Sequence, residues 1–200
     1  MSLTEAVLEY PWVYRLWQAP FLNQKLGPLL AHNDLRGARR VLDVGCGPGT
    51  NAPLFNGVSY LGLDLNPKYI ENAQRRHKGE FVVADVTNYQ AEPGSRFDFI
   101  LVNSILHHID APGTERVLEH LKTLLTPDGH VHLLELVMPG KGAIPRSLTR
   151  WDRGKFPRPD AEWRELFRRH FEPVVIESYP LTALGVTLWH MIYLKGRSRP

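Results

Sequence analysis

The stretch VLDVGCGPGTN, which begins at Val41, constrains the fold of this 200-residue chain more than any other segment. Four residues typical of a buried strand are followed by glycines at positions 45, 47 and 49. Glycine adopts backbone conformations that other residues disfavour, and it lets a ligand approach the main chain closely. The stretch therefore predicts a strand that ends in a ligand-binding loop.

The rest of the chain alternates between strand and helix patterns. After a first strand over 40–44, apolar runs predict strands over 59–64, 80–85, 97–102 and 130–137. Helical periodicity predicts helices over 67–77 (capped by Asn66), 114–125 and 160–171. Five strands that alternate with helices form an open parallel α/β sheet with helices on both faces. The last two runs, 173–179 and 187–194, have only a short turn between them, so we expect an antiparallel pair.

Candidate ligand-binding residues follow the predicted strands. In open parallel sheets, ligands bind at the carboxyl ends of the strands. The glycine loop follows the first strand, Asp64 ends the second, Asp85 ends the third and Asn103 follows the fourth. We therefore expect these groups to lie at one edge of the sheet.

The loop sequence distinguishes between nucleotide ligands. A nucleoside triphosphate loop needs a lysine before its Ser or Thr, but Thr50 directly follows Gly49. A dinucleotide loop needs a third glycine where Thr50 stands, and Pro48 removes a backbone donor. Asp64, 19 residues after Gly45, has the spacing of a ribose-binding carboxylate, and Asp85 is placed for the amine of adenine. Ribose and adenine without phosphate suggest S-adenosylmethionine.

Five successive segments carry a family resemblance. VLDVGCGPGT, YLGLDLNPKYIENA, FVVADV, FDFILVNSILHHI and LLTPDGHVHLLEL resemble the motifs of class I S-adenosylmethionine-dependent methyltransferases. The resemblance implies a Rossmann-like, seven-stranded, mostly parallel sheet with a C-terminal antiparallel strand pair. It also implies S-adenosyl-L-methionine as cofactor, S-adenosyl-L-homocysteine as product, and cofactor contacts at Asp43, Gly45, Cys46, Gly47, Asp64, Leu65, Asp85, Val86 and Asn103.

Each of these residues also has a simpler interpretation. The glycines suit a tight turn, Asp64 suits the start of the following helix, and Asp85 suits a solvated loop. Cys46 suits a small loop residue. The order and spacing of the five motifs favour the cofactor site.

Acid–base catalysis matters only if the methyl acceptor must lose a proton. His107, just after the fourth strand, and Glu135, near the end of the fifth, are the candidate catalytic residues, and His108 is a candidate for binding the acceptor. Packing or a helix start is the alternative role of His107. Two adjacent histidines do not have metal-ligand spacing, so no metal is expected.

Two segments lie outside the predicted core. We expect residues 1–38 to form an N-terminal helical cap, whose Tyr14 and Trp17 would line the acceptor site, and residues 39–200 to form the cofactor-binding domain. Residues 138–160 form a basic insertion near that site, in which Arg150 and Arg153 would bind an anionic acceptor. A solvated charged surface is the alternative for the insertion.

The sequence therefore predicts a methyltransferase that acts on a small molecule, with O-methylation favoured over N-methylation and an anionic acceptor favoured by the insertion. The alternatives are methylation of RNA or of a lipid headgroup, and a non-catalytic cofactor-binding partner subunit. The longest apolar stretch is interrupted by His190, so no transmembrane segment is expected. The single cysteine favours a reducing, cytoplasmic location. The oligomeric state stays open.

Overall fold

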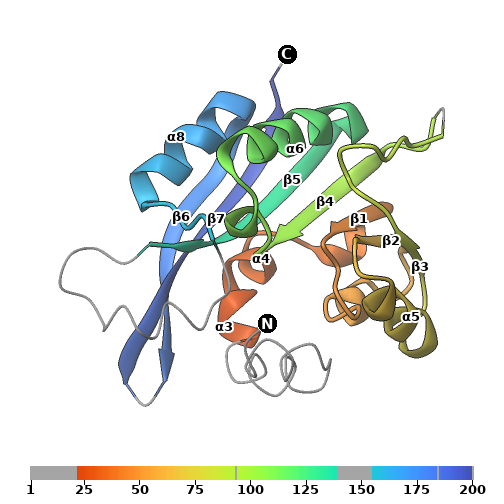
Figure 1. Cartoon of the computed structure of the whole chain (residues 1–200), viewed down its shortest axis with the longest axis horizontal. Helices are drawn as coiled ribbons and strands as arrows, with labels where there is room; N and C mark the ends of the chain where they lie inside the picture. Colours follow the sequence, from red (N-terminus) through yellow and green to blue (C-terminus); the bar gives the residue numbers. More distant parts are fainter. Residues whose placement is uncertain (1–21, 93, 139–154, 184, 200) are drawn as a thin grey trace.

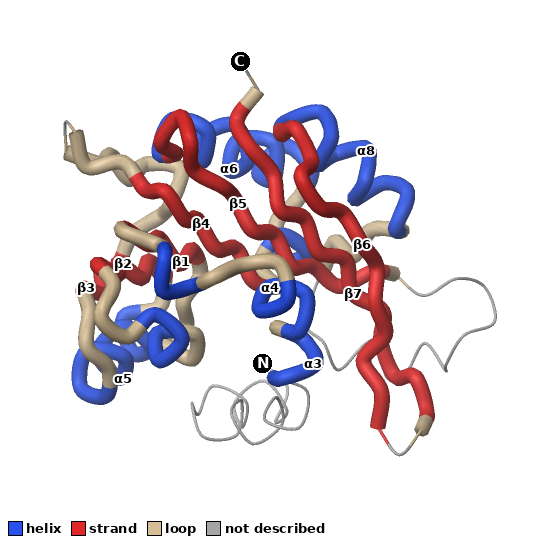
Figure 2. Tube along the Cα trace, turned by 180° about the vertical axis from the view of Figure 1, so that it is seen from behind, coloured by secondary structure: helices blue, strands red, loops and turns tan. Residues whose placement is uncertain are grey.

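A computed structural model describes residues 22–92, 94–138, 155–183 and 185–199. Its centre is a seven-stranded sheet in the order β3-β2-β1-β4-β5-β7-β6 (Figures 1 and 2). The strands are β1 (Arg40–Val44), β2 (Ser59–Asp64), β3 (Glu80–Val83), β4 (Phe97–Asn103), β5 (Leu125–Val137), β6 (Phe171–Ala183) and β7 (Val186–Ser198). Strands β1 to β5 are parallel, and β7 is antiparallel to both β5 and β6. The predicted mixed sheet with its C-terminal antiparallel pair is confirmed.

Helices cover both faces of the sheet (Figure 1). Helices α6 (Ala111–Leu124) and α8 (Asp160–His170) lie on one face, and α4 (Gly27–Ala31) and α5 (Pro67–Arg76) on the other. Shorter elements are α3 (Leu22–Lys25) and the 3-10 turns η2 (Leu35–Gly37), η3 (Ala52–Phe55) and η4 (Leu106–His108). No helix in the described part of the chain is long and apolar enough to cross a membrane.

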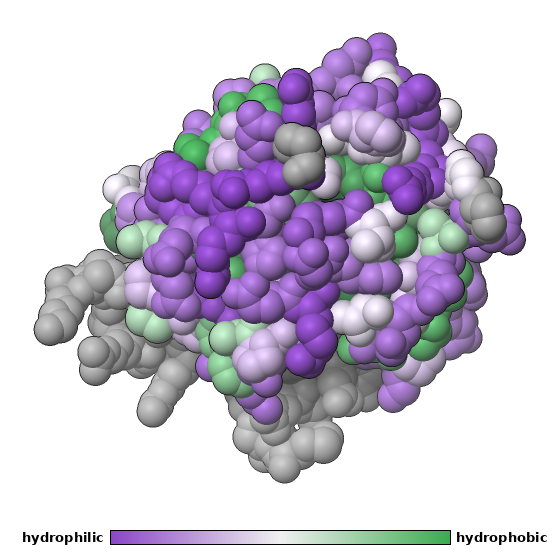
Figure 3. All heavy atoms as spheres, turned by 90° about the horizontal axis from the view of Figure 1, so that it is seen from above, coloured by the Kyte–Doolittle hydropathy of each residue, from purple (hydrophilic) through white to green (hydrophobic). Residues whose placement is uncertain are grey.

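Two apolar clusters hold the layers together. On one face, Trp163 and Phe167 of α8 and Leu118 of α6 are completely buried against the sheet. On the other, Leu29 of α4 and Ala73 of α5 are equally buried. Burial of apolar surface is the main stabilising contribution to such a core. Seen from above, the side of the molecule that carries α6 and α8 is mostly hydrophilic, with only scattered hydrophobic spots (Figure 3).

The strict alternation expected between strands and helices is wrong at two connections. Between β1 and β2 the described helical structure is only η3, and residues 84–92 and 94–96, between β3 and β4, contain no helix. This second connection contains Asn88, Gly94 and Ser95, whose residue types favour turns over helices. Strand β3 also ends at Val83, two residues earlier than predicted.

Several further boundaries differ from the prediction. Strands β6 and β7 are longer than the predicted runs 173–179 and 187–194, and two more differences lie in α6 and β5. Helix α6 begins at Ala111 rather than Thr114, because the Asp110 carboxylate accepts the N–H of Gly113 at 2.8 Å and caps an earlier turn. Strand β5 begins at Leu125 rather than His130, and its pairing with β4 is irregular between Phe97 and Phe99. The differences in α6 and β5 do not move the carboxyl ends of the strands, where the candidate site lies.

The described part of the N-terminal segment, residues 22–38, packs on the β6–β7 hairpin. Gln24 makes two hydrogen bonds to the backbone of Thr182, at 2.8 and 2.9 Å. The Tyr179 hydroxyl donates to the carbonyl oxygen of Lys25 at 2.6 Å. These contacts place α3 beside the end of β6 (Figure 2).

Candidate functional site

The glycine loop follows β1 and lies against the loop that follows β4. The φ angles of Gly45, Gly47 and Gly49 are +69°, +54° and +81°, a region that residues with a Cβ rarely adopt. At Gly45 a Cβ would also stand 2.4 Å from Cγ2 of Ile105. Glycine at this position thus serves both the turn and the close packing of the two loops.

Asp64, at the end of β2, bonds directly to the glycine loop. Its Oδ2 accepts the N–H of Gly47 at 2.9 Å, and its Oδ1 accepts the N–H of Asn66 at 2.8 Å. The neighbouring Leu65 is 70% exposed, which is unusual for a large apolar side chain. The structure therefore brings Asp64, Leu65 and Gly47 together at the predicted edge of the sheet.

Asp43 lies beneath the glycine loop and is completely buried. Its carboxylate accepts hydrogen bonds from the Tyr60 hydroxyl at 2.6 Å and from Asn51 Nδ2 at 3.1 Å. Asn103 Nδ2 donates to Asn51 Oδ1 at 3.5 Å, so polar contacts link the ends of β1 and β4. Burial raises the pKa of Asp43 to about 6, although the hydrogen bonds from Tyr60 and Asn51 oppose this shift. Asp43 thus supports the loop from below.

Cys46 is 3% exposed. Burial and the nearby Asp43 and Asp64 carboxylates raise the pKa of its thiol. The thiol therefore stays protonated and is a poor nucleophile. This environment suits a small loop residue.

Asp85 and Val86 follow β3. The exposed Asp85 carboxylate accepts the Thr87 hydroxyl at 2.7 Å and the Thr87 N–H at 2.8 Å. These bonds hold the pKa of Asp85 below its usual value. Val86 is buried against the core. An ionised, exposed carboxylate beside an apolar wall has the chemistry needed to accept from the amine of adenine.

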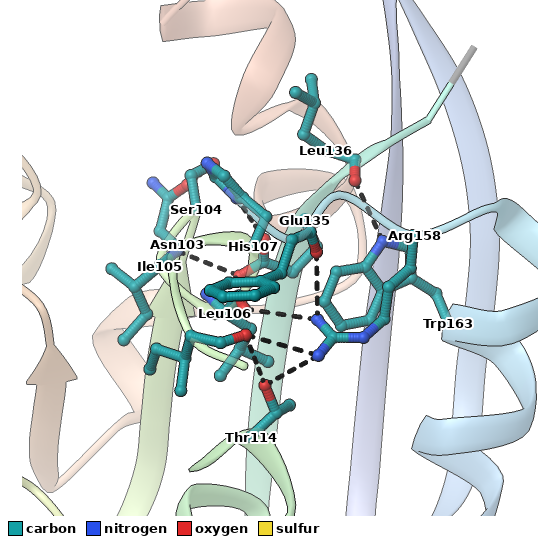
Figure 4. Close-up of polar contacts among 12 residues, drawn as sticks. Asn103, Ser104, Ile105, Leu106, His107, Thr114, Glu135, Leu136, Arg158 and Trp163 are labelled. Atoms are coloured by element: carbon teal, nitrogen blue, oxygen red, sulfur yellow. Dashed lines mark hydrogen bonds and ion pairs between the residues drawn. The ribbon is translucent and has the colours of Figure 1, made fainter. Parts of the chain in front are cut away.

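His107 and Glu135 form a buried pair at the ends of β4 and β5 (Figure 4). The distance from His107 Nδ1 to Glu135 Oε2 is 2.7 Å, and the side chains are 1% and 0% exposed. Glu135 Oε1 accepts the N–H groups of Ile105 and Leu106 at 3.0 and 2.7 Å. Glu135 therefore has both oxygens bound within the protein, an arrangement that suits a positioning role.

Arg158 packs beside this pair (Figure 4). Its guanidinium donates to the carbonyl oxygen of Leu106 at 3.3 Å and to Thr114 Oγ1 at 3.1 Å, and it lies 4.7 Å from the ring centre of Trp163. The side chain is 6% exposed. This basic residue of the insertion is thus part of the folded core and is not directed at an acceptor.

The end of the insertion lies against the loop after β4. The N–H of Phe156 donates to the carbonyl oxygen of His107 at 2.9 Å, and the N–H of Met138 donates to the carbonyl oxygen of Arg158 at 2.8 Å. His108 is exposed, and its ring centre is 4.2 Å from that of His107. The remaining predicted acceptor residues, Tyr14, Trp17, Arg150 and Arg153, lie outside the described residues.

Several supporting residues were not predicted from the sequence. Asn51 and Tyr60 bond to Asp43, while Thr114 and Trp163 contact Arg158. The hydrogen-bonded partners are 8 to 44 residues apart in the sequence. The periodicity of a single helix or strand does not predict contacts at such separations. A polar residue within an apolar pattern, such as Tyr60 in SYLGLD, is the one available signal.

Comparisons with known proteins agree with this geometry. Residues 41–129 match the sequence profile described as "Methyltransferase domain". The chain is 30% identical over 174 residues to a trans-aconitate 2-methyltransferase of Paracidovorax citrulli (strain AAC00-1), covering 82% of this chain and 65% of that protein. It is 34% identical over 106 residues to the Escherichia coli (strain 55989 / EAEC) protein of the same name, covering 50% and 40%. The chain thus spans less than two thirds of the length of these relatives.

Two solved structures share the fold. The N-methyltransferase NodS of Bradyrhizobium japonicum WM9, in complex with S-adenosylhomocysteine, has a TM-score of 0.73 at 15% identity, covering 98% of this chain and 97% of that one. The 1,6-didemethyltoxoflavin-N1-methyltransferase of Burkholderia thailandensis, with S-adenosylhomocysteine bound, has a TM-score of 0.69 at 24% identity, covering 98% and 87%. Within the described residues, no group of three or more His, Cys, Asp or Glu side chains is placed to hold a metal ion.

Proposed function

We propose that this chain, whose residues 41–129 match a methyltransferase domain, is a class I S-adenosylmethionine-dependent methyltransferase that transfers a methyl group to an oxygen of a small anionic acceptor. The observation that carries the proposal is the contact between the Asp64 carboxylate and the Gly47 N–H, which joins the glycine loop to the end of β2. S-adenosylmethionine supplies an activated methyl group on a cationic sulfur. The protein then has to bind and orient the cofactor and the acceptor, and to exclude water from them.

The residues at the strand ends suit the parts of this cofactor. The main chain of Gly45, Cys46 and Gly47 would face the methionyl group, with Asn103 beside it. Asp64 has two oxygens with several lone pairs, so its present hydrogen bonds leave capacity to accept from ribose hydroxyls. Leu65 would cover the ribose, and Asp85 and Val86 would meet the adenine.

The nature of the acceptor follows from charge and from the curated relatives. Both relatives described above are named for trans-aconitate, the anion of an organic acid. A carboxylic acid is ionised at neutral pH, so its oxygen would not have to lose a proton before accepting a methyl group. No general base is then required, which agrees with the engagement of both Glu135 oxygens by other groups. In this proposal His107 and Glu135 orient the loop after β4 and do not remove a proton.

The basic insertion would supply the charges that hold such an acceptor. Its described ends, Met138 and Phe156, lie at the carboxyl ends of β5 and β4 through their backbone contacts. Arg150 and Arg153 belong to the segment between them. Guanidinium groups bind carboxylates with two parallel hydrogen bonds, which fixes orientation as well as charge. We place Tyr14, Trp17 and His108 at the same acceptor site as apolar and polar lining.

A methyl-transfer assay over paired acceptors tests the proposal. Each pair consists of an organic acid, trans-aconitate included, and its full ester, and amines serve as nitrogen acceptors. We expect turnover of the free acids only, and a loss of at least tenfold in kcat/KM for Arg153→Lys. Arg164→Lys is the matched control, because Arg164 is paired with Asp160 on α8. Equal rates for acid and ester, or faster methylation of amines, would contradict the proposed acceptor.

The same assay separates this proposal from its alternatives. Turnover by the isolated chain excludes a non-catalytic partner subunit. Transfer to RNA or to a phospholipid headgroup, with no transfer to the small acids, would replace the small-molecule acceptor with one of those classes.

A further inference from the structure

A cavity of about 420 Å³ lies at the edge of the sheet opposite to the glycine loop. Its walls include Asp98 and Phe99 at the start of β4, His130 and His132 of β5, and Lys195 of β7. Residues 32–34 and 37–39 close it from the side of α4. The candidate cofactor residues follow the ends of β1 to β4, whereas this cavity lies where β1 and β4 begin. It is therefore distinct from the methyl-transfer site.

His132 of β5 lines this cavity. Its ring is 1% exposed and stacks on Phe99 with a centroid distance of 3.9 Å and an interplanar angle of 18°. Its Nδ1 lies 3.0 Å from the Tyr193 hydroxyl, which accepts a hydrogen bond from Asn33 Nδ2 at 2.9 Å. Among the described residues, His132 Nδ1 is the one acceptor within hydrogen-bond distance of this hydroxyl, so we infer that the hydroxyl donates its proton to His132 Nδ1.

This arrangement places the imidazole proton of His132 on Nε2. Burial, together with Lys195 and His130, holds the pKa of His132 well below its usual value, so the ring is neutral and has one N–H. Within the described residues, the buried Nε2 has no hydrogen-bond partner. A buried donor without an acceptor destabilises the fold, and native proteins satisfy such groups with a protein atom, water or a ligand.

Arg39 and Lys195 are the cations that line the cavity, and Arg39 is paired with Asp98 and Asp128. Lys195 Nζ donates to the carbonyl oxygen of His32 at 3.2 Å, and no ion pair of Lys195 occurs among the described residues. Burial and Arg197 lower the pKa of Lys195, and burial, Lys195 and Arg197 lower that of His130. Lys195 and Arg197 repel one another, and a bound anion would relieve this repulsion.

The carboxylates in the wall already have donors. Asp98 accepts two consecutive backbone N–H groups, of Arg39 at 3.0 Å and of Arg40 at 2.7 Å. Asp128 accepts from the Arg39 guanidinium at 3.2 Å, and Asp34 accepts the N–H of Arg36 at 3.1 Å. Their charges are thus partly balanced at the rim, while His132 and Lys195 keep donors for a ligand.

We propose that this cavity binds the carboxylate or phosphate group of a small molecule, with His132 Nε2–H and the Lys195 ammonium as donors. An oxyanion accepts from both groups, and charge-assisted hydrogen bonds of this kind are short and strong. The volume lies within the range of small-molecule pockets. The stacked rings of Phe99, His132 and Tyr193 form a rigid wall beside this group.

Histidine side-chain NMR on the isotopically labelled full chain tests the site. Inorganic phosphate and acetate are titrated separately at constant ionic strength, with chloride as the reference anion. We expect a protonated Nε2 on His132 before addition, and a saturable shift of that signal with one of the two anions. The anion that saturates identifies phosphate or carboxylate as the ligand group. A proton on Nδ1, or shifts that match those in chloride, would overturn the proposal.

Variants separate ligand binding from packing. His132→Phe keeps a ring to stack on Phe99 and removes the donor, and Lys195→Gln removes the charge. Each should weaken anion binding at least tenfold, measured by calorimetry. Lys195→Gln leaves the bond between His132 and Tyr193 in place, so it tests the site even if His132→Phe is less stable. Arg169→Gln on α8, outside the cavity, should leave binding unchanged. Equal affinity in the wild type and both cavity variants would overturn the site. No readout involves methyl transfer, so the result is independent of the proposed function.

Discussion

Glu135 Oε2 lies 2.7 Å from His107 Nδ1, and both side chains are almost fully buried. The same carboxylate accepts two backbone N–H groups of the loop after β4. One side chain of β5 therefore fixes both the imidazole and the main chain of the loop that presents it. The arrangement resembles a helix cap in its chemistry, because orphan backbone donors are satisfied by a side-chain oxygen.

Removal of this carboxylate should destabilise the fold. Glu135→Ala leaves two buried N–H groups and His107 without their acceptor, so we expect a loss of about 3–5 kcal/mol in the free energy of unfolding. Glu135→Gln keeps one acceptor oxygen and should lose about 1–3 kcal/mol. Urea unfolding measures both. Glu172→Gln, at an exposed position of β6, is the control, and a Glu135→Ala variant as stable as this control would contradict the inferred role.

Asp64→Ala should weaken the binding of S-adenosylhomocysteine by about 1.5–3 kcal/mol, the usual contribution of hydrogen bonds to a charged group. The substitution removes the proposed acceptor for the ribose and the bond to the Gly47 N–H. Isothermal titration calorimetry measures the change. Asp128→Ala, at the opposite edge of the sheet, should bind like the wild type. Unchanged affinity in Asp64→Ala would exclude Asp64 from the cofactor site.

Arg158→Lys should impair the acceptor side of the reaction more than the cofactor side. Lysine keeps the charge but cannot reach Leu106, Ile109 and Thr114 at once, as the planar guanidinium does. The loop after β4 should then be less well held, and kcat/KM for the acceptor should fall about tenfold, since small misplacements of reacting groups have large effects on rate.

The affinity of Arg158→Lys for S-adenosylhomocysteine should stay within about twofold of the wild type, because Asp64 and Asp85, proposed for the ribose and the adenine, lie at the end of β2 and just after β3. Arg164→Lys again serves as the control. A parallel loss of cofactor affinity would show that Arg158 supports the whole fold and not the acceptor side alone.

The sequence predicted the elements whose determinants are local. Strands β1 and β2 have the predicted boundaries, and Asn66 caps α5 by accepting the N–H of Lys68 at 3.0 Å. Each depends on an apolar run or a cap within a few residues. The predicted position of the site, at the carboxyl ends of the strands, follows from the same patterns, because parallel strands end at one edge of the sheet.

The contacts that depend on distant residues were not predictable. Arg158 lies within the predicted basic insertion 138–160, but it is buried against Trp163 and the loop after β4. The His132 cavity is formed by residues of β4, β5, β7 and the N-terminal segment, which no local pattern brings together. Such contacts depend on tertiary packing, which overrides the preference of Arg and His for the surface.

The contribution of Asp43 to the stability of the fold should decrease as the pH rises from about 4 to about 6. In the unfolded chain a carboxyl of this type ionises near pH 4, whereas burial raises the pKa of Asp43 in the fold to about 6. The folded chain thus binds more protons than the unfolded chain in this interval. Ionisation of Asp43 at higher pH therefore lowers the free energy of unfolding. A difference of about two pKa units corresponds to about 3 kcal/mol, present below pH 4 and lost as the pH rises through 6.

The measurement compares the wild type with Asp43→Asn, which cannot ionise and retains an oxygen to accept from Tyr60. The free energies of unfolding are measured in urea from pH 4 to pH 7.5. The stability of the wild type relative to Asp43→Asn should decrease with pH. Asp85→Asn should show almost no change relative to the wild type over this range, because the bonds to Thr87 lower the pKa of Asp85 and its contribution is lost only as the pH falls below about 4. A difference between wild type and Asp43→Asn that is constant over this range would mean that Asp43 ionises normally in the fold, so that its hydrogen bonds to Tyr60 and Asn51 offset burial completely.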